Sequence, residues 1–238
     1  FKSVDRTAKT GENIVVSPYS AGVALSMVAE GAQGQTRVEF DNVLNGCIFR
    51  AEDLGSNDTV TVKSANSVWV TDDFSIRNRY SALLEKDFDA FITTLNFADP
   101  ATVKAINNWC SENTEGKITE IIDKINSGVV MMLVNALYFN APWEEAFLEK
   151  NTRDGVFHAY GGDVQVPMMS NTARFNYAEY QGCQLVELPY QGGRYAMYVA
   201  LPAKGMSADD MLSYVNEKIY DYALGMMAPA KVRLTLPK

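Results

Sequence analysis

The segment Val129-Val-Met-Met-Leu-Val-Asn-Ala-Leu-Tyr-Phe-Asn-Ala-Pro-Trp143 contains the longest apolar run of the sequence. From Val129 to Phe139 it is almost continuously apolar, which is typical of a strand that is covered on both faces. One amide, Asn135, interrupts the run. A buried amide without hydrogen-bond partners costs about 1–3 kcal/mol, so we expect this side chain to find partners inside the fold.

The residues before this strand predict helices more often than strands. Ser17-Pro18 matches an N-cap followed by proline at the first helical position, and Gly31 with Gly34 predicts the end of that helix. Thr36 and Glu39 match a capping box, which predicts that a second helix opens at Thr36. Gly31 to Thr36 therefore connects two helices.

Further elements follow from apolar periodicity and turn residues. Helices are predicted at residues 77–88, from Asp99-Pro100 to Gly116, and at 208–219. Strands are predicted at Glu12–Val16, Val60–Val70 with its polar pair Asn66-Ser67, Phe91–Phe97, Leu185–Tyr190, Tyr195–Leu201 and Lys231–Leu236. Leu185–Tyr190 and Tyr195–Leu201 should form a hairpin. Helices first and strands later, without repeats or linkers, favour one α+β domain.

The composition argues against two classes of partner. The net charge of -8 and a pI near 4.8 disfavour nucleic-acid binding, which needs clustered lysines and arginines. The longest uninterrupted apolar stretch, Val129 to Val134, is far too short to span a bilayer. We therefore predict no nucleic-acid partner and no membrane-spanning segment.

Residues that commonly carry catalysis are scarce. His158 is the only histidine, and no serine lies in a G-x-S-x-G elbow, so a serine hydrolase is not supported. Cys47, Cys110 and Cys183 form no C-x-x-C pair, and we predict that they are buried apolar groups. The sequence predicts no catalytic residue, no metal site and no cofactor, and therefore not an enzyme.

Several motifs resemble the serpin family, in the family's own order. They are Asn13-Ile-Val-Val-Ser-Pro-Tyr-Ser20 followed by Glu30-Gly-Ala-Gln-Gly-Gln-Thr36, Asn107-Asn108-Trp109 through Thr114-Glu115-Gly116-Lys117-Ile118, Asn135–Trp143 running on through Phe147 and Asn151-Thr152 to Phe157-His158, Val166-Pro-Met-Met169, Leu188-Pro189-Tyr190, and Leu234-Thr-Leu-Pro-Lys238. The resemblance spans Asn13 to Lys238. It implies a serpin fold of class α+β, with a large mixed central β-sheet A, further sheets and a surrounding helical subdomain.

The resemblance also implies a function and site residues. The implied function is that of a suicide-substrate inhibitor: a target serine or cysteine protease would cleave its reactive loop, and the loop would insert into sheet A while the acyl-enzyme persists. Ser17, Ser20 and Asn135 match the family's shutter, a buried polar cluster under the strands that must part, and Trp143 matches its breach. Taken alone, Ser17 would be a helix cap, Ser20 a turn-facing hydroxyl and Trp143 ordinary core packing.

The family pattern continues beyond Lys238, so residues 1–238 are expected to be one serpin domain that is incomplete at both ends. The hinge, the reactive loop and its scissile bond lie outside this chain, and a C-terminal fragment of the same serpin is the expected partner. The stretch from Cys47 to Val62 is short and has only Arg50 and Lys63 nearby, so activation by a glycosaminoglycan is not expected. An extracellular or cell-surface location is what the resemblance favours.

Two functions remain open at this point. The first is the inhibitor described above, whose hinge would consist of small residues. The alternative is a non-inhibitory serpin that acts as a carrier, chaperone or storage protein, in which a bulky or charged hinge would slow loop insertion.

Overall fold

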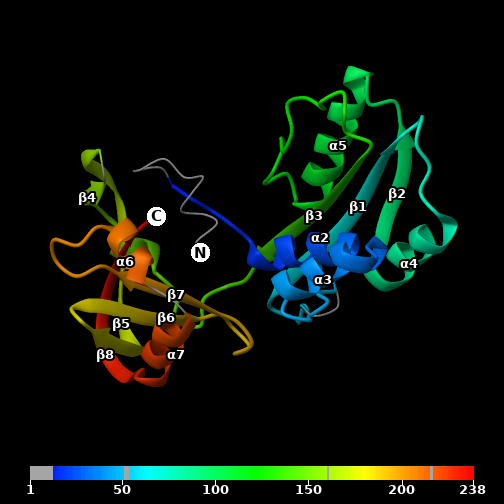
Figure 1. Cartoon of the computed structure of the whole chain (residues 1–238). Coiled ribbons are helices and arrows are strands. Elements are labelled where there is room, and N and C mark those ends of the chain that lie inside the picture. The colour runs from blue at the N-terminus through cyan, green and yellow to red at the C-terminus, as the bar shows by residue number, and fades with distance from the viewer. Residues whose placement is uncertain (1–12, 51–53, 160, 215–216) are drawn as a thin grey trace. The chain divides into compact units, whose positions relative to one another are not determined.

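The computed structural model describes residues 13–50, 54–159, 161–214 and 217–238. The chain divides into two compact units, Ser17–Asn140 and a second unit that joins Phe1–Val16 to Ala141–Lys238. Each unit has its own sheet (Figure 1). Each unit also has its own cluster of buried hydrophobic residues. The class is α+β, as the sequence predicted.

The first unit is built on a mixed sheet of three strands in the order β2-β1-β3. The strands are β1 (Thr61–Thr71), β2 (Ala90–Leu95) and β3 (Met131–Asn140), and β1 runs parallel to β2 and antiparallel to β3. Four helices accompany it: α2 (Pro18–Gly31), α3 (Gly34–Val43), α4 (Asn78–Phe88) and α5 (Pro100–Asn113). The β-branched and aromatic residues of β1 suit a pleated central strand, and six of its residues in succession are buried.

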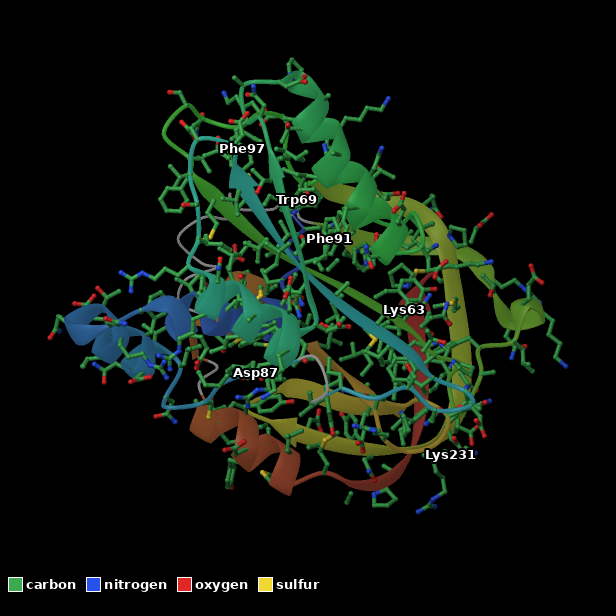
Figure 2. The ribbon with its side chains drawn as sticks, turned by 90° about the vertical axis from the view of Figure 1, so that its right-hand side faces the viewer. Lys63, Trp69, Asp87, Phe91, Phe97 and Lys231 are labelled. Carbon is green, nitrogen blue, oxygen red and sulfur yellow. The ribbon has the colours of Figure 1, made fainter. Side chains whose placement is uncertain are left out.

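Helices contact both faces of this sheet. On one face, Val68 and Val70 of β1 belong to a core cluster with Val23 and Met27 of α2 and with Leu84 and Phe88 of α4. On the other face, Trp69 packs edge-on against Trp109 of α5 and against Phe91 of β2 (Figure 2). Side chains alternate between the faces of a strand, so β1 contributes to both layers of the core.

Most predicted helix boundaries are confirmed, but the capping box at Thr36 is wrong. Ser17 and Asp99 are N-caps whose side chains accept backbone N–H groups, as predicted. Helix α3 instead begins at Gly34, where φ is +60°, and its N-cap Gln33 makes no side-chain cap bond. Glycine adopts that backbone conformation without strain, so the chain enters the helix two residues early.

Two predicted strands differ from the structure. Residues 13–16 form no strand, Val15 is almost fully exposed, and Glu12 lies outside the described residues. Strand β3 forms, but within the described residues it pairs only with β1. Only Ala136 of β3 is buried and Phe139 is exposed, so the prediction that both faces are fully covered is wrong for this sheet. An edge strand has fewer neighbours to exclude water.

The second unit is an antiparallel sheet with two helices. Its strands are β4 (Arg153–Ala159), β5 (Gly162–Tyr180), β6 (Cys183–Pro189), β7 (Ala196–Leu201) and β8 (Ala228–Pro237), in the order β4-β5-β6-β7 with β8 also paired to β5. The 3-10 turn η2 (Glu149–Asn151) precedes β4, and helices α6 (Ala208–Tyr214) and α7 (Glu217–Gly225) precede β8. The β6–β7 hairpin is confirmed, whereas the predicted helix 208–219 is two helices.

The core of this unit lies on one face of the sheet. Phe175, Val186 and Leu188 are buried there, and Val232 and Leu234 of β8 pack against them. Among the described residues, no helix is both long and apolar enough to cross a membrane.

Candidate functional site

Asn135 joins two neighbouring strands through its side-chain amide. Its Nδ2 donates to Asn66 Oδ1 at 2.9 Å and to Ser64 Oγ at 3.0 Å, and the carbonyl of Ala65 lies at 3.4 Å. The register sets Asn66 of β1 directly opposite Asn135 of β3. The expectation that this amide finds partners within the fold is therefore confirmed.

Asn66 extends this network to a helix. It is only 2% exposed, and its Nδ2 donates to the carbonyl of Phe88 at 2.7 Å, at the end of α4. Asn66 lies on the same face of β1 as Val68, which packs against α2 and α4. We call Ser64, Asn66 and Asn135 the amide cluster; it links β3, β1 and the end of α4 by side-chain hydrogen bonds.

One acceptor of the amide cluster has no partner. Oδ1 of Asn135 is buried and accepts no hydrogen bond from any described residue. An unsatisfied buried acceptor is destabilising by about 1–3 kcal/mol. In the amide cluster, Nδ2 of Asn135 is thus hydrogen-bonded to two residues of β1, whereas its Oδ1 has no donor among the described residues.

The structure does not connect the two serines to this cluster by hydrogen bonds. Ser17 Oγ accepts from the backbone N–H of Ser20 at 3.1 Å and so caps α2. Within the described residues, Asn135 has no hydrogen bond to either serine. Helix α2, which Ser17 caps and which contains Ser20, does pack against β3.

Replacing Ser17 with alanine is expected to destabilise the protein by about 1 kcal/mol, because the first turn of α2 loses its capping acceptor. Chemical denaturation followed by circular dichroism measures this loss. Ser17→Asp is the matched control, since its carboxylate can cap the same N–H and favours a helix N-terminus. Equal destabilisation by both substitutions would contradict a capping role.

Tyr80 ties α4 to α2 on the same side of the sheet. Its hydroxyl donates to the carbonyl of Met27 at 2.7 Å, and a Cβ on Gly31 would lie 3.0 Å from its ring. Burial, with a smaller effect of the Glu30 carboxylate, raises the pKa of Tyr80 to about 12. The phenol therefore stays neutral in the folded state at pH values where an exposed tyrosine ionises.

This pKa predicts alkaline destabilisation. Below pH 10 the phenol is protonated in both states; from pH 10 to about pH 12 it ionises first in the unfolded chain, so the free energy of unfolding falls as pH rises. Urea denaturation at pH 9, 10 and 11 should show a steeper loss for the wild type than for Tyr80→Phe. Parallel pH profiles would show that Tyr80 does not contribute.

Trp143 lies in the second unit, in an aromatic stack. Its ring stacks on Tyr190 with centroids 4.3 Å apart and meets Phe147 edge-on at 6.4 Å. Backbone bonds from Glu144 to Pro189 and from Gln191 to Pro142 hold the two segments together. Trp143 also packs against the core of this unit, so its structural environment is that of a half-buried packing residue.

The histidine and the three cysteines lie apart from one another in the described chain. His158 is exposed and its Nδ1 is 2.7 Å from Asp163 Oδ1 across the β4–β5 turn. Cys110 is buried as predicted, and burial raises the pKa of its thiol, but Cys47 is exposed in the loop after α3 and Cys183 is only partly buried. In the described parts of the chain, no group of three or more histidine, cysteine or acidic residues could hold a metal ion.

Residues 1–238 match the family model described as Serpin (serine protease inhibitor). The chain belongs to the serpin family. It is 33% identical to "Serine protease inhibitor" of the jellyfish Cyanea capillata, over 95% of this chain and 66% of that protein. It is 31% identical to a serpin-like protein of Thermococcus kodakarensis, over 100% of this chain and 59% of that protein.

Solved serpin structures have the same fold. The native state of the thermophilic serpin tengpin superposes with a TM-score of 0.89 at 26% identity, covering 98% of this chain and 63% of that one. Ovalbumin from emu superposes with a TM-score of 0.86 at 22% identity, covering 96% and 67%. The chain spans about 60% of the length of the curated relatives described above.

The sequence interpretation left Ser64 and Asn66 outside the site. Asn66 was visible as half of a polar pair inside a strand, but nothing in the linear sequence shows which strand lies beside it. The alternation of Ser64, Asn66 and Val68 was the available clue, because it places both polar residues on the face that packs against α2 and α4.

Proposed function

We propose that the protein of which this chain is a part inhibits a serine protease, or a cysteine protease, by trapping it as an acyl-enzyme. The protease nucleophile attacks the scissile carbonyl of the reactive loop, the C–N bond breaks, and the leaving amine takes the proton. The loop then inserts into the sheet that contains β3 before water can cleave the ester or thioester. Family membership supports this proposal, and the amide cluster is the structural observation that carries it.

The amide cluster gives the sheet a specific resistance to rearrangement. Asn135 fixes β3 to β1 by two short hydrogen bonds, and Asn66 fixes β1 to the end of α4. Displacement of β3 from β1 would break these partly buried hydrogen bonds, and each loss is destabilising. The amide cluster would thus raise the kinetic barrier between a metastable native state and the more stable loop-inserted state.

A similar protein supports the idea of two states. Tengpin has been solved in a native and in a latent state, and the present chain superposes on the latter with a TM-score of 0.87 at 26% identity. Because this chain superposes on both states of tengpin, the comparison supports the proposal that its fold can convert between two arrangements. Ser17, Ser20 and Trp143 are proposed to act with Asn135 at the shutter and the breach.

A denaturing gel tests this function. The complete gene product would be mixed with trypsin-, elastase- and papain-like proteases, each with a control in which the catalytic nucleophile is replaced by alanine. We expect one active protease to give a boiling-stable band at the summed mass, and its control to give none. Clean cleavage with full remaining protease activity would instead indicate a non-inhibitory serpin.

A further inference from the structure

Part of the face of the second sheet opposite its core, formed by β4, β8 and residues 162–176 of β5, is basic. Ala173, Phe175, Val232 and Leu234 point into the core, so alternate residues of β5 and β8 point outward. The outward cations on β4, β5 and β8 are Arg153, Arg174, Lys231 (labelled in Figure 2) and Arg233, and all four are exposed.

On β4, on β8 and on residues 162–176 of β5, no carboxylate lies beside these four cations. Further along the same face, Glu187 of β6 accepts hydrogen bonds from Asn176 and Tyr198. The continuous register places only glycine, alanine, proline, apolar, hydroxyl and amide side chains beside them on β4, on residues 162–176 of β5 and on β8. The whole chain has a net charge of -8, so four cations on these three strands with no acid beside them are a local reversal of charge. Such a reversal attracts anions from solution.

A polar pocket of about 430 Å³ lies within this face. It is lined by Asn151, Arg153, Ser170, Asn171, Thr172 and Arg233. The lining combines two guanidinium groups with two hydroxyls and contains no acid. Asn171 is paired with the core-facing Leu234, and its Nδ2 is committed to the carbonyls of residues 145 and 146, so this amide is not available to a ligand.

The two arginine side chains that line the pocket differ in their hydrogen bonds to the protein. Nη1 of Arg153 donates to the carbonyls of Lys150 and Thr152, at 2.5 and 2.8 Å, which fixes the guanidinium while its Nε and Nη2 hydrogens stay available. Arg233 has no carboxylate within ion-pair distance in the described part of the chain. Its partner across the strands is Thr172, whose hydroxyl is a further donor.

We propose that this pocket binds a tetrahedral oxyanion, that is, a phosphate or sulfate group. Donors reach the pocket from three strands: Arg153 from β4, Ser170 and Thr172 from β5, and Arg233 from β8. Arginine pairs with phosphate and sulfate through parallel charge-assisted hydrogen bonds, and hydroxyls can complete the shell. The pocket belongs to the second unit, whereas the amide cluster belongs to the first. The proposed anion binding does not depend on protease trapping.

The group can be a free anion or part of a polymer, and calorimetric titration of the complete gene product separates these sources. One arm uses pyrophosphate and the other uses heparin as a sulfated polysaccharide, both at constant ionic strength. Arg153→Gln and Arg233→Gln should each weaken the binding by about tenfold, since each removes a charge-assisted contact. Binding of pyrophosphate supports a free anion, and binding of heparin alone supports a polymer-borne sulfate.

Arg174→Gln is the matched control. Arg174 lies on the same exposed face but does not line the pocket, so its substitution should weaken binding less than twofold. Equal weakening by all three substitutions would show diffuse attraction to the basic face and overturn the pocket. Absence of binding in both arms would also overturn it. If Arg153→Gln unfolds the protein, the result for Arg233→Gln decides whether the pocket binds the anion. Arg233 makes no side-chain hydrogen bond to any described residue, so its substitution breaks none.

Discussion

Replacing Trp69 with alanine is expected to lower the free energy of unfolding by about 3–5 kcal/mol. The side chain is 3% exposed, and its ring contacts Phe91 and Trp109 edge-on. Its Nε1 also donates to the buried hydroxyl of Ser67 at 2.8 Å. The substitution therefore opens a cavity between β1 and α5 and leaves a buried hydroxyl without its donor.

Urea denaturation and thermal unfolding measure this effect, and a loss of this size should lower the midpoint by roughly 10 °C for a protein of this length. Phe91→Ala is the matched control: Phe91 touches the same ring but is 51% exposed, so we expect less than half of the loss. A loss below about 1 kcal/mol for Trp69→Ala would contradict its place in the core.

Replacing Asn135 with alanine is expected to speed heat-induced polymerisation, or conversion to a latent form, by about tenfold or more. The substitution removes the bonds to Ser64 and Asn66 that fix β3 to β1. Loss of about 1–3 kcal/mol from the starting state alone lowers the barrier by that amount, and each 1.36 kcal/mol is a factor of ten in rate. Size-exclusion chromatography after timed heating of the complete gene product measures the conversion.

Asn140→Ala is the control for this experiment. Asn140 lies on the same strand, but it is exposed and donates only to the hydroxyl of Tyr138. Its substitution should leave the conversion rate unchanged, whereas Asn66→Ala should act in the same direction as Asn135→Ala. An unchanged rate for Asn135→Ala would remove this residue from the shutter.

Local features of the fold were predictable because each depends on neighbouring residues. Ser17 and Asp99 cap their helices through N–H groups two or three residues away. The β6–β7 hairpin follows from two apolar runs separated by glycines. The start of α3 was mispredicted, because Gly34 adopts a positive φ and the helix begins there, two residues before the capping-box position Thr36.

Of the three residues of the amide cluster, the sequence pattern singled out only Asn135 as a site residue. Asn135 interrupts an apolar strand, and the need for hydrogen-bond partners follows from burial alone. Its partners depend on the register between β3 and β1, which are about 70 residues apart in the chain. The basic face required the same kind of knowledge, since Arg153 and Arg233 come together only through their pairing with β5.

Thermal unfolding before and after cleavage of the reactive loop most directly tests the claim that stored free energy drives the inhibitor. The complete gene product would be nicked in the loop with a limiting amount of a protease that it does not trap. We expect the nicked protein to unfold at least about 10 °C higher, because the inserted loop adds a strand and several kcal/mol of stability. An equal or lower midpoint after a verified single nick would contradict loop insertion.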